Sequence, residues 1–230
     1  MVIPIAEIYE AVQAEGNHRT PAVFVRVWGC NLRCSFNKEE GVQGRCDTPY
    51  AVFRGEKEQL FDGDVVKRIL ELKHRHVVFT GGEPLLYQEG IRNIISTLPT
   101  DYFYEVETNG TLELVGFISR WVDQFNISVK LSSSNQWKGF DNKRINNKAL
   151  ELFPKAKSIF KFVVTSEDDM KEIKEIESIR PDIPIYLMPQ GETKEQVLNN
   201  IKSTMDLALE NGYGFTNRDH ILAYGDERAR

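Results

Sequence analysis

Residues 76–98 read HVVFTGGEPLLYQEGIRNIISTL, and this stretch decides the fold. The apolar, β-branched run at 76–80 is typical of a strand. Over 88–98 the apolar residues recur at the spacing of an amphipathic helix. A glycine-rich turn at 81–84 joins the two. A strand followed directly by a helix is the repeating unit of a parallel sheet, because the helix returns the chain to the end where the strand began.

The same alternation extends in both directions along the chain. Strands are predicted at 22–28, 76–80, 102–107, 127–131, 158–165 and 184–188, and helices at 64–74, 88–98, 113–121, 168–179 and 193–209. Asp62 or Asp64 marks one helix start, and Thr193 with Gln196 forms a capping box at another. A closed barrel of eight such units needs about 250 residues. Six units in 230 residues therefore predict a partial, open parallel β/α barrel, with residues 1–230 as a single domain.

Composition sets limits on partners and location. The chain is 41% hydrophobic, which suits one sizeable core, and its net charge of −5 gives no reason to expect direct binding to nucleic acid. No apolar run approaches the roughly 20 residues that span a bilayer, and the N-terminus lacks the features of a signal peptide. We therefore expect a cytoplasmic protein without a membrane partner. Three cysteines within seventeen residues are a poor disulfide framework and a plausible metal site.

Unusual residues follow the predicted strands one after another. Cys30, Cys34 and Cys46 come after the first strand, the turn 81–84 after the second, and the segment ETNG at 107–110 after the third. Ser128 and Lys130 lie on the fourth, residues 165–166 end the fifth, and residues 188–191 end the sixth. Because loops at the carboxyl ends of parallel strands build the active site, these residues predict one shared site.

The cysteines and the glycine turn admit more than one interpretation. Three thiolates can bind three irons of a [4Fe–4S] cluster and leave the fourth iron open. The alternatives are three buried structural cysteines, or a zinc site whose fourth ligand is His18. In the turn, glycines allow close approach of the backbone to a ligand, and Glu83 can accept from a cofactor ammonium. The alternative there is an ordinary strand-to-helix connection. The turn at 81–84 comes one strand–helix unit after the cysteines, and this position favours a role in the site.

Taken together, Cys30-x3-Cys34 with a later third cysteine, GGEP at 81–84 and ETNG at 107–110 resemble the radical S-adenosylmethionine superfamily. Within it, the chain resembles the 7-carboxy-7-deazaguanine synthases. The supporting stretches cover nearly the whole chain: IYEAVQAEG (8–16), FVR (24–26), CDTPY (46–50), TGGEPLL (80–86), ISVKLSSS (127–134), YLMPQG (186–191) and HILAYGDER (220–228).

The resemblance implies a lyase of 7-deazaguanine and queuosine biosynthesis. Such enzymes convert 6-carboxy-5,6,7,8-tetrahydropterin to 7-carboxy-7-deazaguanine, a ring contraction with loss of ammonia. The reduced cluster cleaves S-adenosyl-L-methionine to a radical that takes a hydrogen from the substrate and later receives one back, and Mg²⁺ assists. The resemblance also implies a homodimer and a reductant such as flavodoxin.

Site residues follow from the resemblance by position, with no catalytic side chain beyond the cluster and the cofactor. The expected substrate-binding residues are Val12, Gln13, Ala14, Glu15, Arg26 and Thr80. The expected cofactor-binding residues are Gly82, Glu83, Cys46, Asp47, Ser128, Val129, Lys130 and Gln190. The expected metal ligands are Cys30, Cys34 and Cys46 for the cluster and Thr48 for Mg²⁺.

Two departures from the family pattern stand out. Ala14 replaces a glycine, which puts in question any contact that needs glycine there. Residues 37–45 read as an insertion before Cys46, so the cluster loop must be rebuilt locally. Two other functions stay open at this point: a glycyl-radical activase that acts on a partner protein, and a non-enzymatic iron–sulfur or zinc scaffold.

Overall fold

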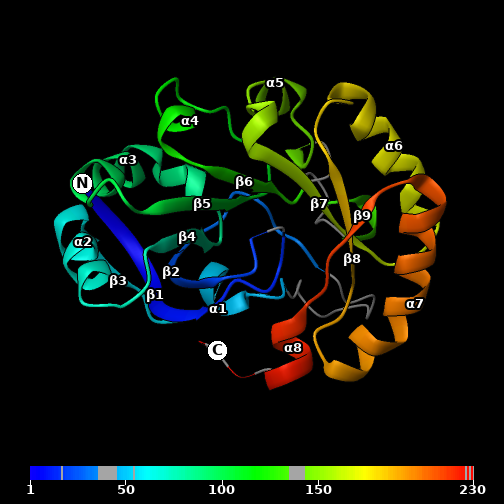
Figure 1. Cartoon of the computed structure of the whole chain (residues 1–230), viewed down its shortest axis with the longest axis horizontal. Coiled ribbons are helices and arrows are strands. Elements are labelled where there is room, and N and C mark those ends of the chain that lie inside the picture. Colours follow the sequence, from blue (N-terminus) through cyan, green and yellow to red (C-terminus); the bar gives the residue numbers. More distant parts are fainter. Residues whose placement is uncertain are drawn as a thin grey trace.

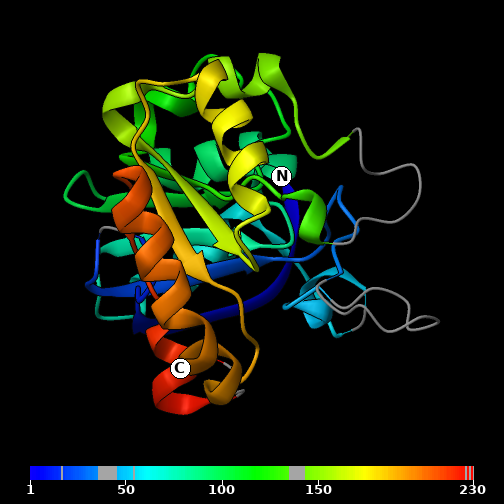
Figure 2. The ribbon, with the colours of Figure 1, turned by 90° about the vertical axis from the view of Figure 1, so that its right-hand side faces the viewer.

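A computed structural model describes residues 1–16, 18–35, 46–53, 55–134, 143–225, 227 and 229. The predicted insertion at 37–45 lies outside these residues. Across the described chain, one curved sheet carries helices on its outside (Figures 1 and 2).

The sheet has nine strands in the described residues, in the order β3-β1-β2-β4-β5-β6-β7-β8-β9. From β2 to β9 all neighbours are parallel, while β1 is antiparallel to both β2 and β3. The strands are β1 (Val2–Val12), β2 (Pro21–Val27), β3 (Glu58–Phe61), β4 (His76–Gly81), β5 (Phe103–Thr108), β6 (Gln124–Ile127), β7 (Ser158–Val164), β8 (Ile185–Pro189) and β9 (Gly214–Phe215).

Helices follow most of the parallel strands and cover the convex face of the sheet, with α7 and α6 beside β8 and β7 (Figure 1). The α-helices are α1 (Pro49–Val52), α2 (Asp62–Leu70), α3 (Gln88–Thr97), α4 (Ile118–Trp121), α5 (Asn147–Glu151), α6 (Asp169–Ile179), α7 (Lys194–Asn211) and α8 (Asp219–Tyr224). Short 3-10 turns are η1 (Pro84–Tyr87), η2 (Ser132–Ser134) and η4 (Lys155–Lys157). None of the helices in the described part of the chain is long and apolar enough to cross a membrane.

The two faces of the sheet differ in chemistry because side chains alternate along each strand. In β7, Phe160, Phe162 and Val164 join the apolar core under the helices, whereas Lys161 and Val163 line a cavity on the inner face. The other parallel strands repeat this division. The helices therefore supply the buried apolar area, and the inner face is left for polar groups.

The predicted open β/α barrel is confirmed, and five of the six predicted strands lie within one residue of their observed bounds. The fourth is wrong: β6 begins three residues before the predicted start and ends at Ile127, four residues before the predicted end, so Ser128 and Lys130 follow the strand instead of lying on it. The polar residues Gln124 and Asn126 made the true strand resemble a loop. Of the helix predicted at 113–121, only the last turn, α4, is present. Strands β1, β3 and β9 had no predicted counterpart.

Candidate active site

The inner face of the sheet encloses a cavity with an empty volume of about 1080 Å³, part of it open to solvent. Because the cavity opens to solvent, a ligand can enter it from outside. The cavity lining comes from β1, β2, β4, β5, β7 and β8, from the segments that follow β1, β2, β4, β5 and β6, and from residues at the start of α8.

All three cysteines line this cavity, and none of them is in a disulfide. Burial is the main cause that raises the pKa of the Cys30 and Cys46 thiols to about 12, so the metal-free thiols are neutral. Bound iron would deprotonate them outright. The Leu32 backbone N–H donates to Cys30 Sγ at 3.4 Å, and hydrogen bonds of this kind tune iron–sulfur clusters. The donor set fits a three-cysteine cluster.

The zinc interpretation fits less well. With Zn–S bonds of about 2.3 Å, thiolates on one tetrahedral ion lie only about 4 Å apart. Within the described residues, no three His, Cys, Asp or Glu side chains are grouped closely enough to hold a single ion. His18 is not the missing ligand, because its ring packs 4.7 Å from the Phe103 ring, at the amino end of β5.

The glycine turn at 81–84 packs directly against the cysteine loop. The Gly82 N–H donates to Val27 O at 3.1 Å, and the Glu83 N–H donates to Gly29 O at 2.9 Å. A Cβ on Gly82 would lie 1.9 Å from Gly29 O, and a Cβ on Gly81 would lie 2.2 Å from Val27 O. Glycine is therefore required at both positions because the turn packs against the backbone that leads to Cys30, and that contact leaves no room for a Cβ.

We predict that Gly82→Ala destabilises the protein by about 1–3 kcal/mol, the usual cost of overpacking. Its iron content after reconstitution should also fall, because the backbone at Gly29 must move. Urea unfolding and iron analysis measure both effects. Gly116→Ala is the matched control, since a Cβ there meets no atom within 4 Å. Equal iron content and stability in the two variants would contradict the prediction.

Glu83 is fully buried and bonded to protein donors. Its carboxylate accepts from the Asn109 N–H at 2.7 Å, from the Thr108 hydroxyl at 2.8 Å and from the Leu85 N–H at 3.0 Å. Burial raises the pKa of Glu83 to about 7, although these bonds act in the opposite direction. The side chain ties the turn after β4 to the end of β5. A contact from Glu83 to a cofactor ammonium stays a prediction.

Gln13 and Glu15 enter the cavity from the end opposite to the cysteines. Because β1 runs antiparallel to β2 and Val12 pairs with Pro21, the residues after β1 lie at the amino end of β2. Gln13 Nε2 donates to Glu105 at 2.5 Å and to Glu107 at 3.2 Å. Ala14 is not in the left-handed region of φ, so its backbone conformation does not require glycine.

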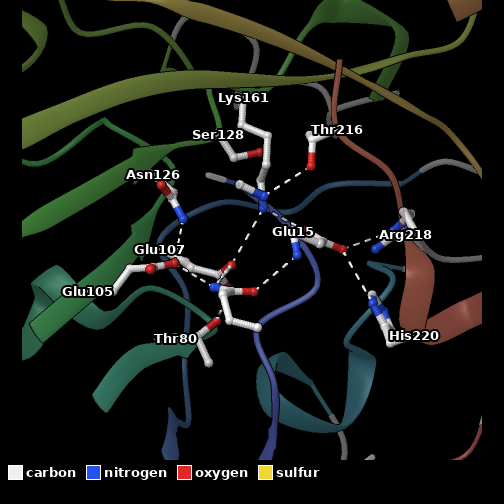
Figure 3. A network of polar contacts seen from close by, with 12 residues as sticks. Glu15, Thr80, Glu105, Glu107, Asn126, Ser128, Lys161, Thr216, Arg218 and His220 are labelled. Carbon is white, nitrogen blue, oxygen red and sulfur yellow. Dashed lines mark hydrogen bonds and ion pairs between the residues drawn. The ribbon is translucent and has the colours of Figure 1, made fainter. Parts of the chain in front are cut away.

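Lys161 is a buried cation that lines the cavity, with 5% of its side chain exposed, and it lies at the centre of the polar network in Figure 3. Its Nζ lies 2.5 Å from Glu15 Oε2 and 3.5 Å from Glu107 Oε1. Burial by itself would raise the pKa of Glu15, but Lys161, Arg218 and His220 lower it well below its usual range. The same pairing raises the pKa of Lys161 in spite of its burial. The group is therefore a fixed array of charges.

A second layer of polar side chains lies behind this array. Glu105 is fully buried and accepts from Asn126 at 2.5 Å (Figure 3). It also accepts from Gln13 at 2.5 Å, and its other oxygen is 3.1 Å from His76 Nε2. Burial raises the pKa of Glu105. Glu107 lies two residues further along β5, nearer the cysteines, and accepts from the Thr80 hydroxyl at 2.7 Å. This layer holds Gln13 and Thr80 in one orientation.

Arg26 projects from β2 into the cavity with 13% of its side chain exposed. Its Nη2 donates to the Tyr9 hydroxyl at 3.0 Å, its Nε lies 3.3 Å from Glu7 Oε2, and its guanidinium lies over the Tyr50 ring. These contacts fix the plane of the guanidinium. A planar, oriented guanidinium is suited to bidentate binding of a carboxylate.

Most residues predicted from the sequence to form the site line this one cavity. They are Val12, Gln13, Ala14, Glu15, Arg26, Thr80, Gly82, Cys30, Cys34, Cys46, Asp47, Thr48, Ser128 and Lys130. Glu83, Val129 and Gln190 are not among its described lining residues. Thr165 and Ser166 also lie elsewhere, because both bond to Asp169 at the start of α6.

Sequence reasoning missed Lys161, Arg218 and the Glu105 layer. Lys161 was hidden inside the apolar run SIFKFVV, and a lysine in such a run was the available signal. Its Glu15 partner lies 146 positions away, and Arg218 contacts Asp47 across 171 positions. No local pattern pairs residues at that separation.

No family model matches the chain, but curated relatives do. A 7-carboxy-7-deazaguanine synthase from Pyrobaculum aerophilum is 32% identical over 99% of this chain and 97% of its own length. One from Halobacterium salinarum is 32% identical over 97% of this chain and 91% of its own length.

Solved structures support the fold. QueE from Escherichia coli matches with a TM-score of 0.69 and 20% identity, covering 95% of this chain and 94% of that chain. Streptococcus suis SuiB bound to S-adenosylmethionine matches with a TM-score of 0.54 and 14% identity over 83% of this chain and 48% of its own. These likenesses show the architecture. Since full-length relatives at 32% identity carry one shared name, the chain belongs to the 7-carboxy-7-deazaguanine synthase family.

Proposed function

We propose that the protein converts 6-carboxy-5,6,7,8-tetrahydropterin to 7-carboxy-7-deazaguanine, as a radical S-adenosylmethionine lyase of 7-deazaguanine biosynthesis. One observation carries the proposal beyond family membership. A single cavity joins three cysteines that form no disulfide to an oriented guanidinium and to two carboxylates that flank a buried lysine. The first set suits a cluster, and the second suits a polar heterocycle that bears a carboxylate.

The cofactors are a [4Fe–4S] cluster and S-adenosyl-L-methionine, and Mg²⁺ is part of the proposal. Cys30, Cys34 and Cys46 would hold the cluster. Ser128 and Lys130, joined by a 2.9 Å hydrogen bond, follow β6, line the same cavity and would contact the cofactor. The cluster and cofactor, when bound, supply the homolytic chemistry that removes a hydrogen atom from the substrate.

The chain's own side chains would bind and orient the substrate. Arg26 would hold the carboxylate through its planar fork. Glu15 and Glu107 offer acceptors for the N–H groups of the pterin edge, and Lys161 lies within ion-pair distance of both carboxylates. Thr80 and Gln13 are held by Glu107, which orients them before a ligand arrives. A preoriented polar site rejects ligands that would leave its buried groups unpaired.

The test is an anaerobic assay of the reconstituted protein with reductant, S-adenosylmethionine, Mg²⁺ and the carboxypterin, read by mass spectrometry. We expect 7-carboxy-7-deazaguanine, and none when S-adenosylmethionine or reductant is left out. Formation of 5′-deoxyadenosine without consumption of the pterin would contradict the proposal and favour an activase that acts on a partner protein.

Thr48 is the proposed Mg²⁺ ligand. It lines the cavity, its hydroxyl makes no capping bond to α1, and Oγ1 lies 3.5 Å from Cys46 Sγ. A hydroxyl oxygen suits this hard ion. We predict that Thr48→Ala keeps its full iron content but needs more Mg²⁺ for half-maximal turnover. Thr48→Ser, which keeps the oxygen, should titrate like the wild type. An unchanged titration for Thr48→Ala would count against the assignment.

A homodimer, a flavodoxin-like reductant and a cytoplasmic location stay part of the proposal. The outer face of α7 supports the dimer, because Leu198, Met205 and Leu209 are exposed there with helical spacing. Light scattering would measure the oligomeric state. Comparing turnover with flavodoxin and with a chemical reductant would test the electron donor.

A further inference from the structure

Arg218 connects three segments that are far apart in the sequence. Its side chain is 10% exposed, and each guanidinium nitrogen has its own acceptor. Nη2 donates to Asp47 Oδ2 at 2.8 Å, Nη1 donates to Gly191 O at 2.8 Å, and Nε donates to Glu15 Oε1 at 3.3 Å. Figure 3 shows Arg218 reaching Glu15 from the segment that enters α8. One side chain therefore joins the segment after β1, the loop after β8 and the end of the cysteine loop.

The joined segments belong to opposite sides of the cavity. Glu15 lies in the segment expected to bind the substrate and is held on its other oxygen by Lys161. Asp47 lies between Cys46 and Thr48, on the side of the cluster. The sequence of contacts Lys161–Glu15–Arg218–Asp47 thus runs from β7 across the cavity to the cluster loop.

The chemistry of this position is specific to arginine. The guanidinium is planar and its donors diverge in fixed directions, so it can hold three acceptors at once. A lysine would keep the charge but could not span the same three groups. A neutral side chain would also leave the buried Glu15 and Asp47 with less compensating charge. The three contacts use all three nitrogens on protein acceptors, which favours a role in placement over direct contact with a ligand.

We propose that Arg218 is a positioning residue that fixes the substrate-side segment relative to the cluster loop, so that hydrogen removal stays coupled to product formation. This inference rests on the proposed function. A displacement of about 1 Å in a catalytic arrangement can cost on the order of 100-fold in rate. Loosening the connection should therefore harm the pterin reaction more than cleavage of S-adenosylmethionine.

The test compares Arg218→Met and Arg218→Lys with Arg180→Met in the reconstituted holoenzyme. Arg180 is a matched control, because it also bonds to backbone carbonyls, those of Leu150 and Phe153, and to Asp182, away from the cavity. We expect Arg218→Met to lower kcat for the pterin on the order of 100-fold. It should also form several 5′-deoxyadenosine molecules per product, and Arg218→Lys should lie between it and the wild type. Arg180→Met should lower Tm but leave this ratio unchanged.

Hydrogen exchange supplies a readout independent of activity. Arg218→Met and Arg218→Lys should both exchange faster at residues 13–16 and 46–53, whereas Arg180→Met should do so near 150–153. Unchanged exchange at both cavity segments, or an unchanged ratio of 5′-deoxyadenosine to product, would overturn the inference, and so would the same ratio change in Arg180→Met. If Arg218→Met fails to fold, Arg218→Lys decides. Failure of the proposed function is a separate result, seen as absence of product from the wild type.

Discussion

Cys46→Ala is expected to abolish formation of both 5′-deoxyadenosine and product. Three thiols reach the cavity, and the described residues supply no group of three His, Cys, Asp or Glu that would replace them around one ion. Loss of one ligand leaves a second iron without a protein thiolate, so the cluster should be lost or inactive. The same result is expected for Cys30→Ala and Cys34→Ala.

The measurement for Cys46→Ala combines iron content, the charge-transfer absorbance of the reconstituted protein and anaerobic activity. Cluster binding also stabilises the folded chain by mass action, so reconstitution should raise the Tm of the wild type and not that of the variant. Thr48→Ser is the control, because it alters the same loop while keeping all three thiols. Full iron content and full activity in Cys46→Ala would remove the cysteine from the ligand set.

Arg26→Ala should have the second largest effect, and on one reaction only. If Arg26 grips the substrate carboxylate, its loss breaks a buried charge pair, which costs about 2–5 kcal/mol. That corresponds to a fall in kcat/KM for the carboxypterin of between roughly thirtyfold and several thousandfold. Uncoupled cleavage of S-adenosylmethionine should be retained, because the cysteines and the residues after β6 lie elsewhere in the cavity.

Two further variants distinguish the charge of Arg26 from the geometry of its guanidinium. Arg26→Lys keeps the charge without the planar fork and should recover part of the lost turnover. Tyr9→Phe removes the 3.0 Å hydrogen bond to the guanidinium and leaves the cation in place, so its effect should be smaller. Equal losses of pterin turnover and of S-adenosylmethionine cleavage in Arg26→Ala would mean that the residue serves the cofactor or the fold.

Local sequence patterns were sufficient for most of the sheet. Apolar runs such as 76–80 and 158–165 became β4 and β7, because a buried strand needs β-branched and aromatic side chains whatever its neighbours are. The Thr193 side chain accepts from the Gln196 N–H, as the capping box predicts. The strand predictions failed where polar residues lie on the inner face of the sheet. Asn126 can be buried within β6 because Glu105 accepts a hydrogen bond from its side-chain amide. The alternating polar residues of β1 concealed that strand in the same way.

For the site, the sequence determined which residue types occur and which strand ends carry them, and the family resemblance added their expected roles. Together, the sequence and the resemblance assigned the cysteines, the glycine turn, Arg26 and Gln13 to one site. In the structure these residues line one cavity. The sequence could not reveal that Gly82 is required by contact with Gly29, or that Glu15 enters from the amino end of the sheet.

Only the tertiary structure decided the arrangement of charge. Lys161, Glu15, Arg218 and Asp47 are joined by contacts between residues 146 to 203 positions apart. Turns, caps and periodicity reflect interactions within a few residues, and those can be read from a single chain. An ion pair across the cavity exists because the sheet curves and returns distant segments to one place. Burial there then shifts the pKa of each group through partners that the local sequence does not name.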